Sequence, residues 1–367
     1  NISILRISIL LVGSSTIKTS GACALISKNY SRVKVSAGAF LGVLLPIFLI
    51  WLSICGGQYD VGTDYWSYYG FFNGEDFYKF RDSGEYLFAW IISLCNSLGL
   101  YGQSLFYVFY GINFYFFYLI LKRIDLKYIF LFILLYITIT GLFNNQLNAL
   151  RQATAIYMGT YALILIVERK KWKAFFFIIL SALIHRSAFF LLVALGMTRL
   201  VSRLMPKSLF VLLCISLCCS FVLRVEMLEL IIPYLSDIYT NYIMGQESGD
   251  KSILLKITKL IFIPFYLFAL FRFKKMELTE LETVLFKWGF ISFCLRLMVL
   301  NMSVVYRIFD YFLLLSVFPF YYYLRYLVRN NRSFVFVAIV FLLSVFYILK
   351  VTVFASAEYQ YESVYFS

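Results

Sequence analysis

The sequence predicts an all-α, polytopic membrane protein with about ten transmembrane helices, some of them broken or re-entrant. Two observations support this fold class. Of the 367 residues, 62% are hydrophobic and only 14% are charged, whereas soluble domains carry about 25% charged residues. Apolar stretches long enough to cross the hydrocarbon core as helices also recur along the whole chain. This composition disfavours a soluble enzyme and a disordered chain.

Nine stretches have the composition of a single transmembrane helix. They are residues 37–55, 104–121, 128–143, 151–167, 208–223, 253–271, 284–300, 306–324 and 333–354. We therefore expect one membrane domain over residues 37–354. A Ser/Thr-rich tail at 1–36, in which the features of a signal peptide are not evident, would precede it. A C-terminal tail at 355–367 would follow it.

Two further apolar stretches do not fit a simple span. Residues 174–201 are too long for one span and contain His185 and Arg186 in their middle. We expect either two half-crossings or one helix broken by these polar residues. Residues 86–98 are shorter than a full span, so we expect a re-entrant or interfacial segment there.

The charges predict how the chain is oriented. The sequence has 33 Lys and Arg against 19 Asp and Glu, a net charge of +14. Most of the cations lie in residues 1–36 and in short connections such as 122–127 and 169–173, and basic connections stay cytoplasmic during insertion. The acidic segments 56–85 and 224–251 should lie outside the cytoplasm. The excess is thus explained without a nucleic-acid partner.

The seven cysteines do not indicate a metal site. No two of them form a CxxC pair, and the sequence has a single histidine, which cannot complete a typical zinc site. We read the cysteines as small residues of membrane-embedded helices, and we predict neither a metal nor a cofactor.

Polar residues within or beside apolar segments are the functional candidates, because ionisable groups in a membrane are costly. In the loop at 61–69, Asp64 could accept a proton or sugar hydroxyls, while Tyr65 and its aromatic neighbours could stack on sugar rings. An interfacial aromatic belt is the alternative interpretation of this loop. Glu85 begins the 86–98 segment, either as a functional acid or as a helix cap stabilised by the helix dipole.

A second group of candidates begins the stretch at 151–167. Asn144, Asn148 and Arg151 are spaced i, i+4 and i+7, so they would share one face of a continuous helix, and Gln152 follows them. The fork of an arginine binds two phosphate oxygens at once. The alternative is an anchor that extends to the membrane interface.

Three arginines and a histidine complete the candidates. His185 could act as a general base beside Arg186, or it could be a packing residue. Arg296 lies inside an apolar stretch and would align with Arg307 if the helix continued between them, although Arg307 could simply pair with Asp310. Several cations on the non-cytoplasmic side oppose the insertion bias, and a diphosphate ligand would explain them.

At these residues the sequence resembles the EpsG-type family of Wzy-like polysaccharide polymerases. The shared pattern is Val-Gly-Thr-Asp-Tyr at 61–65, Glu-Tyr at 85–86, Asn-x-x-Arg-Gln at 148–152 and His-x-Ser-Ala at 185–188. The resemblance covers most of residues 40–200 and continues more loosely to the end. The first 36 residues have no counterpart in it.

The resemblance implies a multi-pass protein of the bacterial inner (cytoplasmic) membrane with short periplasmic loops, similar to O-antigen and exopolysaccharide polymerases. Such a membrane glycosyltransferase joins undecaprenyl-diphosphate-linked oligosaccharide repeat units on the periplasmic face, and undecaprenyl diphosphate leaves. The implied partners are this substrate, membrane lipid and a chain-length regulator. No nucleotide sugar, metal or cofactor is implied.

This chemistry gives each candidate an expected role. We expect Arg151 and Arg296 to contact the diphosphate, with Arg307 secondary. The accepting hydroxyl needs a proton acceptor, for which His185 is favoured over Asp64. The further catalytic candidate is Glu85, and the further substrate-binding candidates are Asn148, Gln152, Arg186 and Tyr65.

Other functions remain open at the level of sequence. A flippase or other transporter of lipid-linked oligosaccharides would suit broken helices, but the sequence shows no paired halves. A membrane acyltransferase acting on sugars would need an acyl-donor site, and the single histidine has no acid close to it in sequence. A non-catalytic scaffold would leave the membrane-embedded arginines unexplained.

Overall fold

The computed structural model describes residues 37–223, 260–353 and 359–365. Within these residues the secondary structure is helical, apart from an isolated antiparallel bridge between Gln58 and Ser363. The all-α prediction is confirmed for the described part of the chain. The N-terminal tail at 1–36 and the acidic segment at 224–251 lie outside the described residues.

The first half of the described chain contains both short and long helices. The α-helices are α2 (Ala37–Trp51), α3 (Tyr65–Phe72), α4 (Tyr78–Asp82), α5 (Tyr86–Ser97), α6 (Gln103–Leu121), α7 (Ile129–Leu135), α8 (Leu142–Asn148), α9 (Leu150–Val167), α10 (Lys171–Ile184), α11 (Leu192–Arg203) and α12 (Pro206–Val222). Two π-helical segments, η1 (Leu52–Gly56) and η3 (Tyr136–Thr140), and two 3₁₀-helices, η2 (Leu126–Tyr128) and η4 (Arg186–Leu191), lie between them.

The second half repeats this mixture of helices and helical turns. Its elements are α15 (Ile263–Arg272), η7 (Phe273–Met276), α16 (Glu280–Met298), α17 (Ser303–Phe309), η8 (Asp310–Ser316), α18 (Val317–Arg329) and α19 (Ser333–Thr352). A capping box begins α16, because the Thr279 side chain and the Glu282 side chain each bond the other's backbone N–H.

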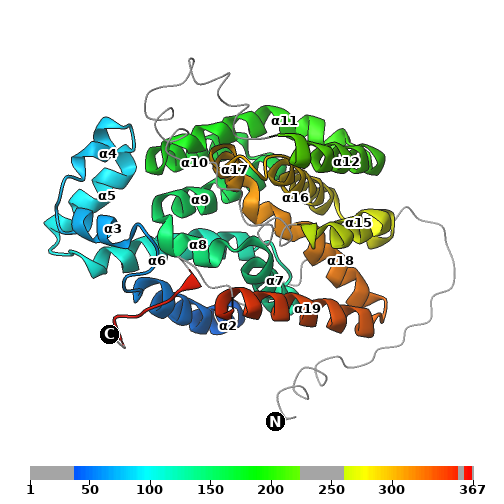
Figure 1. Ribbon diagram of the computed structural model, residues 1–367, viewed down its shortest axis with the longest axis horizontal. Coiled ribbons are helices and arrows are strands. Elements are labelled where there is room, and N and C mark those ends of the chain that lie inside the picture. Colours follow the sequence, from blue (N-terminus) through cyan, green and yellow to red (C-terminus); the bar gives the residue numbers. More distant parts are fainter. Residues whose placement is uncertain (1–36, 224–259, 354–358, 366–367) are drawn as a thin grey trace, which may run out of the picture.

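Helix α9 lies near the middle of the molecule in Figure 1, with α3, α4 and α5 to one side and α15 and α16 to the other. In the apolar window of α9, 83% of the residues are buried, whereas only 11% are buried in α19. Both helices are apolar, so the difference is one of position: α9 packs among other helices, and α19 presents its side chains outward. An outward apolar face of this kind suits contact with lipid.

The expected count of about ten transmembrane helices is not confirmed. Four described helical segments are long and apolar enough to cross a membrane, namely α6, α9, Val305–Arg329 and α19. A fifth span results if Leu126–Thr140 and Leu142–Asn148, which meet at 59°, count together. Several other expected spans form shorter helices, since breaks and charged residues interrupt them.

Two of these breaks place polar residues at helix ends. The stretch 174–201 divides at His185, whose extended backbone (φ −148°, ψ 112°) ends α10 before η4 begins. The expected continuous helix around Arg151 is interrupted at Ala149 (φ −97°, ψ 59°), so α8 ends at Asn148 and α9 begins at Leu150. In both places the chain changes direction beside a polar side chain.

The basic connections meet at the far end of α9. Arg123, after α6, forms an ion pair with Glu168 at 3.0 Å between Nε and Oε1. Arg169 forms an exposed ion pair with Glu280 at the start of α16, with 2.6 Å between guanidinium nitrogen and Oε1. The connections that the charge pattern predicts to share one side of the membrane are therefore neighbours in space.

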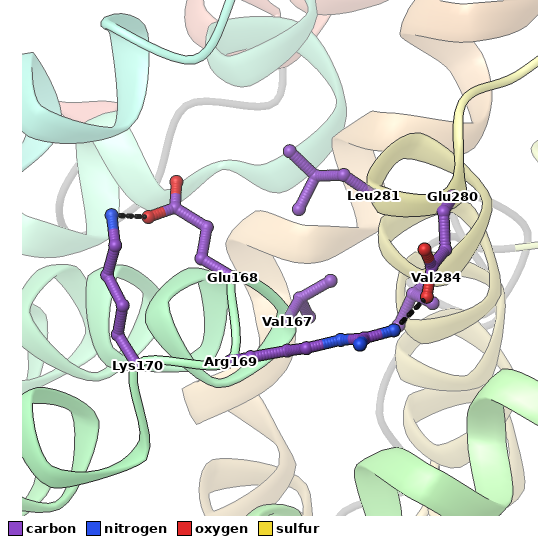
Figure 2. Close-up of a pocket in the computed structure, with 7 residues that line it drawn as sticks. All are labelled: Val167, Glu168, Arg169, Lys170, Glu280, Leu281 and Val284. Carbon is purple, nitrogen blue, oxygen red and sulfur yellow. Dashed lines mark hydrogen bonds and ion pairs between the residues drawn. The ribbon is translucent and has the colours of Figure 1, made fainter. Parts of the chain in front are cut away.

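A pocket of about 390 Å³ lies at this basic end, and Figure 2 shows its walls. It is lined by residues 167–170 and by Glu280, Leu281 and Val284. None of the candidate residues from the sequence lines this pocket. It is also crossed by the Arg169–Glu280 ion pair, so it is not our candidate functional site.

Candidate functional site

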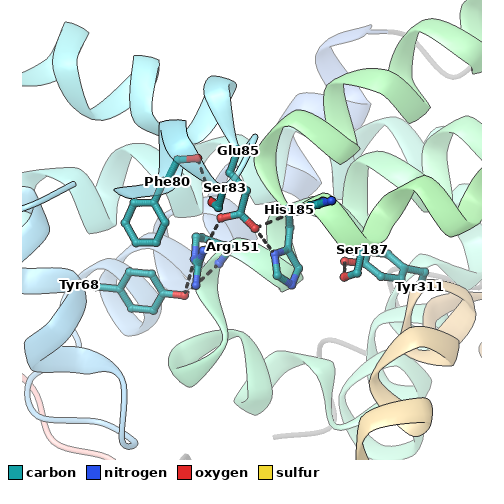
Figure 3. A network of polar contacts seen from close by, with 9 residues as sticks. Tyr68, Phe80, Ser83, Glu85, Arg151, His185, Ser187 and Tyr311 are labelled. Carbon is teal, nitrogen blue, oxygen red and sulfur yellow. Dashed lines mark hydrogen bonds and ion pairs between the residues drawn. The ribbon is translucent and has the colours of Figure 1, made fainter. Parts of the chain in front are cut away.

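Three ionisable side chains from three separate elements meet at the other end of α9 (Figure 3). The Glu85 carboxylate, just before α5, accepts a hydrogen bond from the guanidinium of Arg151 in the first turn of α9. Its other oxygen lies 2.6 Å from Nδ1 of His185. The backbone N–H of Arg186 donates to that same oxygen at 3.3 Å. Glu85 therefore joins segments that are about 65 and 100 residues apart in the chain.

Burial makes this cluster energetically demanding. The Glu85 side chain is only 5% exposed, while Arg151 and His185 are each 26% exposed. A buried carboxylate is tolerated when it is paired and hydrogen-bonded, and removing one partner of such a pair typically costs about 3–5 kcal/mol. The exposed parts of Arg151 and His185 are thus the surfaces that a ligand could reach.

Burial alone would raise the pKa of the Glu85 carboxyl. The hydrogen bond to His185 and the charge of Arg151 outweigh this effect, so the pKa is lowered. Glu85 is therefore ionised in the cluster and available as an acceptor for the Nδ1–H of His185. In a neutral imidazole with its proton on Nδ1, Nε2 is the nitrogen that can accept a proton.

Aromatic rings enclose the Arg151 guanidinium. Its carbon lies 4.4 Å from the centre of the Phe80 ring and 5.6 Å from that of Phe88. The Tyr68 hydroxyl accepts from Nε of Arg151 at 3.4 Å. These contacts fix the direction of the guanidinium, because its planar group packs against aromatic faces as well as donating hydrogen bonds.

The turn between α4 and α5 positions Glu85 in the cluster. Gly84 adopts a positive φ of 86°, and the N–H of Glu85 donates to the carbonyl of Phe80 at 2.7 Å. Glu85 is the N-cap residue of α5, yet its side chain makes no capping hydrogen bond. Glu85 therefore occupies the cap position, but its carboxylate binds Arg151 and His185 rather than a backbone N–H of α5.

Asn148 and Arg151 do not share a helix face, because the helix breaks between them. Asn148 Oδ1 accepts from the backbone N–H of Asp64 at 3.0 Å and from the Thr63 hydroxyl at 3.3 Å. Asn144, which the same spacing grouped with them, accepts from the Tyr347 hydroxyl at 2.9 Å. The three residues thus have separate partners, and Asn148 holds the loop that carries Asp64.

The aromatic loop at 61–69 is partly helical, since α3 begins at Tyr65. The Tyr65 ring is 1% exposed, donates its hydroxyl to Gln103 at 2.9 Å and stacks on Phe106. Trp66 is 52% exposed. Asp64 is exposed beside them. Of this loop, Asp64 and Trp66 are therefore the side chains that a sugar could contact most directly.

Arg296 lies in a second polar cluster. Helix α16 ends at Met298, so the alignment of Arg296 with Arg307 along one continuous helix does not occur. Nε of Arg296 instead lies 2.9 Å from the Asp310 carboxylate, and its guanidinium packs on the Tyr306 ring, whose hydroxyl accepts from it. Arg296 is thus compensated by an acid. The side chain of Arg307 lies at the surface.

Two hydrogen bonds connect the segment around Arg307 to the first cluster. Gln152 Nε2 donates to the Arg307 carbonyl at 3.0 Å, and the hydroxyls of Ser187 and Tyr311 lie 2.8 Å apart. Figure 3 shows Ser187 and Tyr311 next to the Glu85 cluster. Arg186, whose side chain is exposed, lies between His185 and Ser187 in the chain.

The structure thus brings together Glu85, Arg151, His185 and Arg186, whereas Arg296 and the loop that carries Asp64 have other partners. It also adds Phe80 and Tyr311, which sequence reasoning missed, and it gives contacts to Tyr68 and Ser187, which the motifs at 61–69 and 185–188 contain. The only signal of Phe80 and Tyr311 was membership of aromatic stretches, which are common throughout this chain. Within residues 37–223, 260–353 and 359–365, no group of three or more His, Cys, Asp or Glu side chains is arranged to hold a metal ion.

The fold and the site define a helical membrane protein with a partly buried acid–histidine–arginine cluster. A family model described as the EpsG family matches residues 42–365, and the chain belongs to this family of Wzy-like polymerases. No curated protein and no solved structure shows significant similarity to the chain.

Proposed function

We propose that this protein is an inner-membrane polysaccharide polymerase. It transfers a growing oligosaccharide from undecaprenyl diphosphate to a sugar hydroxyl of the next lipid-linked repeat unit on the periplasmic face. The observation that carries the proposal is the contact of Glu85 with both His185 and Arg151, which supports the pairing of a general base with a phosphate-binding group in one site. Membership of the EpsG family supports the same class of reaction.

His185 is the proposed general base. Glu85 accepts the Nδ1–H and orients the ring, so Nε2 can take the proton of the accepting hydroxyl. The hydroxyl oxygen then forms a bond with the anomeric carbon of the donor sugar. The bond from that carbon to the phosphate oxygen breaks, and its electron pair leaves with the lipid diphosphate. Glu85 is thus a positioning residue, whereas Asp64, in the neighbouring loop, remains the alternative base.

Arginines balance the charge of the leaving diphosphate. Arg151 offers its partly exposed edge, and the side chains of Arg186 and Arg307 are exposed on adjoining segments. Arg151 is held by Glu85, so the exposed Arg186 on the next segment adds positive charge beside it. Preorganised cations of this kind stabilise charge that develops in the transition state.

The test is polymer length in a deletion strain that expresses variants of the protein. We expect His185→Gln to reduce long polymer by about 100-fold or more, the usual effect of losing a general base. Arg186→Gln should reduce it by about 10-fold or more, and Arg186→Lys should restore only part because lysine lacks the bidentate fork. Arg332→Gln, which removes an exposed arginine far from the site in sequence, is the matched control.

Each outcome separates this proposal from its alternatives. Wild-type polymer from His185→Gln at normal membrane levels would overturn the assignment of the base. Single repeat units that accumulate on the periplasmic side of the deletion strain are expected of a missing polymerase. Units retained on the cytoplasmic side would indicate a flippase instead, and normal polymer lacking acyl groups would indicate an acyltransferase.

A further inference from the structure

A second pocket of about 440 Å³ lies next to the Glu85 cluster. Helices α4, α5 and α10 form its walls, and these helices pack on one another. It is lined by Phe77, Tyr78, Arg81, Tyr86, Leu87, Ala89, Trp90, Ser93 and Leu183. Two of these residues adjoin the site directly, since Tyr86 follows Glu85 and Leu183 precedes His185 by two residues.

The lining residues of this groove follow the axis of α5. Arg81 lies in α4, and Tyr86 is the first residue of α5, next to Glu85 in the chain. Trp90 and Ser93 lie one and two turns further on, so the groove extends about 10 Å from Tyr86 to Ser93 at the rise of an α-helix. Leu183, near the end of α10, lines the same groove. Its walls are therefore mostly hydrocarbon and aromatic, with a cation at the end that meets the site.

Arg81 is the charged residue of this groove. Its side chain is exposed, and it makes no ion pair within residues 37–223, 260–353 and 359–365. Tyr78, Tyr86 and Trp90 are 61%, 55% and 59% exposed. A groove lined by exposed aromatic rings and an exposed cation matches a ligand that has an anionic head and a hydrocarbon chain.

We infer that this groove holds the first isoprene units of a polyprenyl diphosphate, with Arg81 on the diphosphate and the chain along α5 between Tyr86 and Ser93. This inference rests on the proposed function, because it assigns a lipid site to the same substrate. The groove places the phosphate end of the lipid beside Arg151 and Arg186. The remaining isoprene units extend past Ser93 into the surrounding lipid.

The experiment is photocrosslinking of the full-length protein in detergent with farnesyl diphosphate that carries a diazirine near the end of its chain. We expect adducts in the peptides that contain Trp90, Ser93 or Leu183. Unlabelled undecaprenyl diphosphate should compete, whereas farnesol and inorganic diphosphate should compete poorly, because each lacks one half of the ligand.

Matched variants test the two ends of the groove. Ser93→Trp fills the groove and should reduce labelling by about 5-fold or more, whereas Leu94→Trp changes the neighbouring exposed residue of α5 and should not. Arg81→Gln should weaken competition by undecaprenyl diphosphate by about 10-fold, the effect of one lost charge-assisted contact. Lys79→Gln, on the same short helix but outside the groove, is its control.

Failure of this inference is distinguishable from failure of the proposed function. Adducts confined to other segments, or equal effects of Ser93→Trp and Leu94→Trp, would overturn the groove. Labelling is independent of turnover, so a polymerase variant such as His185→Gln should retain it. Groove labelling that competes with farnesol as well as with the diphosphate would indicate an apolar site without phosphate recognition and would also overturn the proposal.

Discussion

Glu85 lies between two partners, and each of its oxygens has a separate one. One oxygen binds the Arg151 guanidinium, which compensates the negative charge. The other oxygen lies beside Nδ1 of His185 and orients the imidazole ring. Burial alone would raise the pKa of the Glu85 carboxyl, but the two partners outweigh burial, and the net effect is a lowered pKa. A carboxyl whose pKa is lower in the folded state stabilises that state above its unfolded pKa, and this stabilisation is lost as the pH falls through the folded pKa.

The pH dependence of unfolding therefore tests the state of Glu85. At neutral pH, Glu85→Gln should lower the free energy of unfolding by about 2–4 kcal/mol, because Arg151 loses its charged partner. The difference from wild type should narrow between about pH 5 and pH 3, where the wild-type carboxylate becomes protonated. Thermal unfolding of the purified protein in detergent measures both effects.

An exposed acid of the same segment provides the control. Glu75→Gln should change stability little at either pH, since surface substitutions are usually within about 0.5 kcal/mol. A destabilisation by Glu85→Gln that is the same at both pH values would contradict an ionised Glu85 in the cluster.

Among the elements, the breaks between helices decide where functional residues point. The apolar stretches, the break at His185 and the concentration of candidates could be predicted from the sequence, since length and charge determine them. The break at Ala149 could not, because alanine is a good helix former and the interruption depends on tertiary contacts of Asn148 and Arg151. The pairing of Arg296 with Asp310 could not be predicted from the sequence either, since it requires the chain to turn after Met298.

The loop between η1 and α3 provides the prediction at this scale. Gly62 adopts a φ of 75°, and a Cβ placed there would lie 2.6 Å from Asn148 Oδ1. Gly74 also has a positive φ, of 96°, but a Cβ there would meet nothing within 4 Å. Gly62→Ala should therefore lower polymer yield and stability more than Gly74→Ala, because both strain the backbone but only the first displaces the side chain that holds Asp64.

Polymer length and thermal unfolding of the two glycine variants measure this difference. Gly62→Ala/Asn148→Gly removes the clash together with the side chain that holds Asp64, so restoration of activity by this pair would show that the Asn148 contact is dispensable. Equal losses in Gly62→Ala and Gly74→Ala would show that the contact with Asn148 is unimportant.

Across the whole molecule, α9 separates two kinds of polar surface. Arg151 lies in its first turn and Glu168 follows its last residue, about 25 Å apart at the rise of an α-helix. This distance is close to the thickness of the hydrocarbon core. The basic connections meet at the Glu168 end, and the acid–histidine–arginine cluster lies at the other. Charge pattern and helix length therefore agree on a cytoplasmic Glu168 end, which remains a prediction.

Accessibility of single cysteines in a cysteine-free background tests this orientation. In intact spheroplasts, a membrane-impermeant maleimide should label Asp82→Cys at once, and it should label Lys173→Cys only after permeabilisation.

The re-entrant or interfacial prediction for 86–98 adds a third position, Leu98→Cys, which should react like Asp82→Cys. It is supported by the Gly102 N–H, which donates to the Phe72 carbonyl at 3.3 Å and so ties the segment after α5 back to α3. Labelling of Leu98→Cys only after permeabilisation would mean that α5 crosses the membrane, and reversed labelling of the other two positions would overturn the orientation itself.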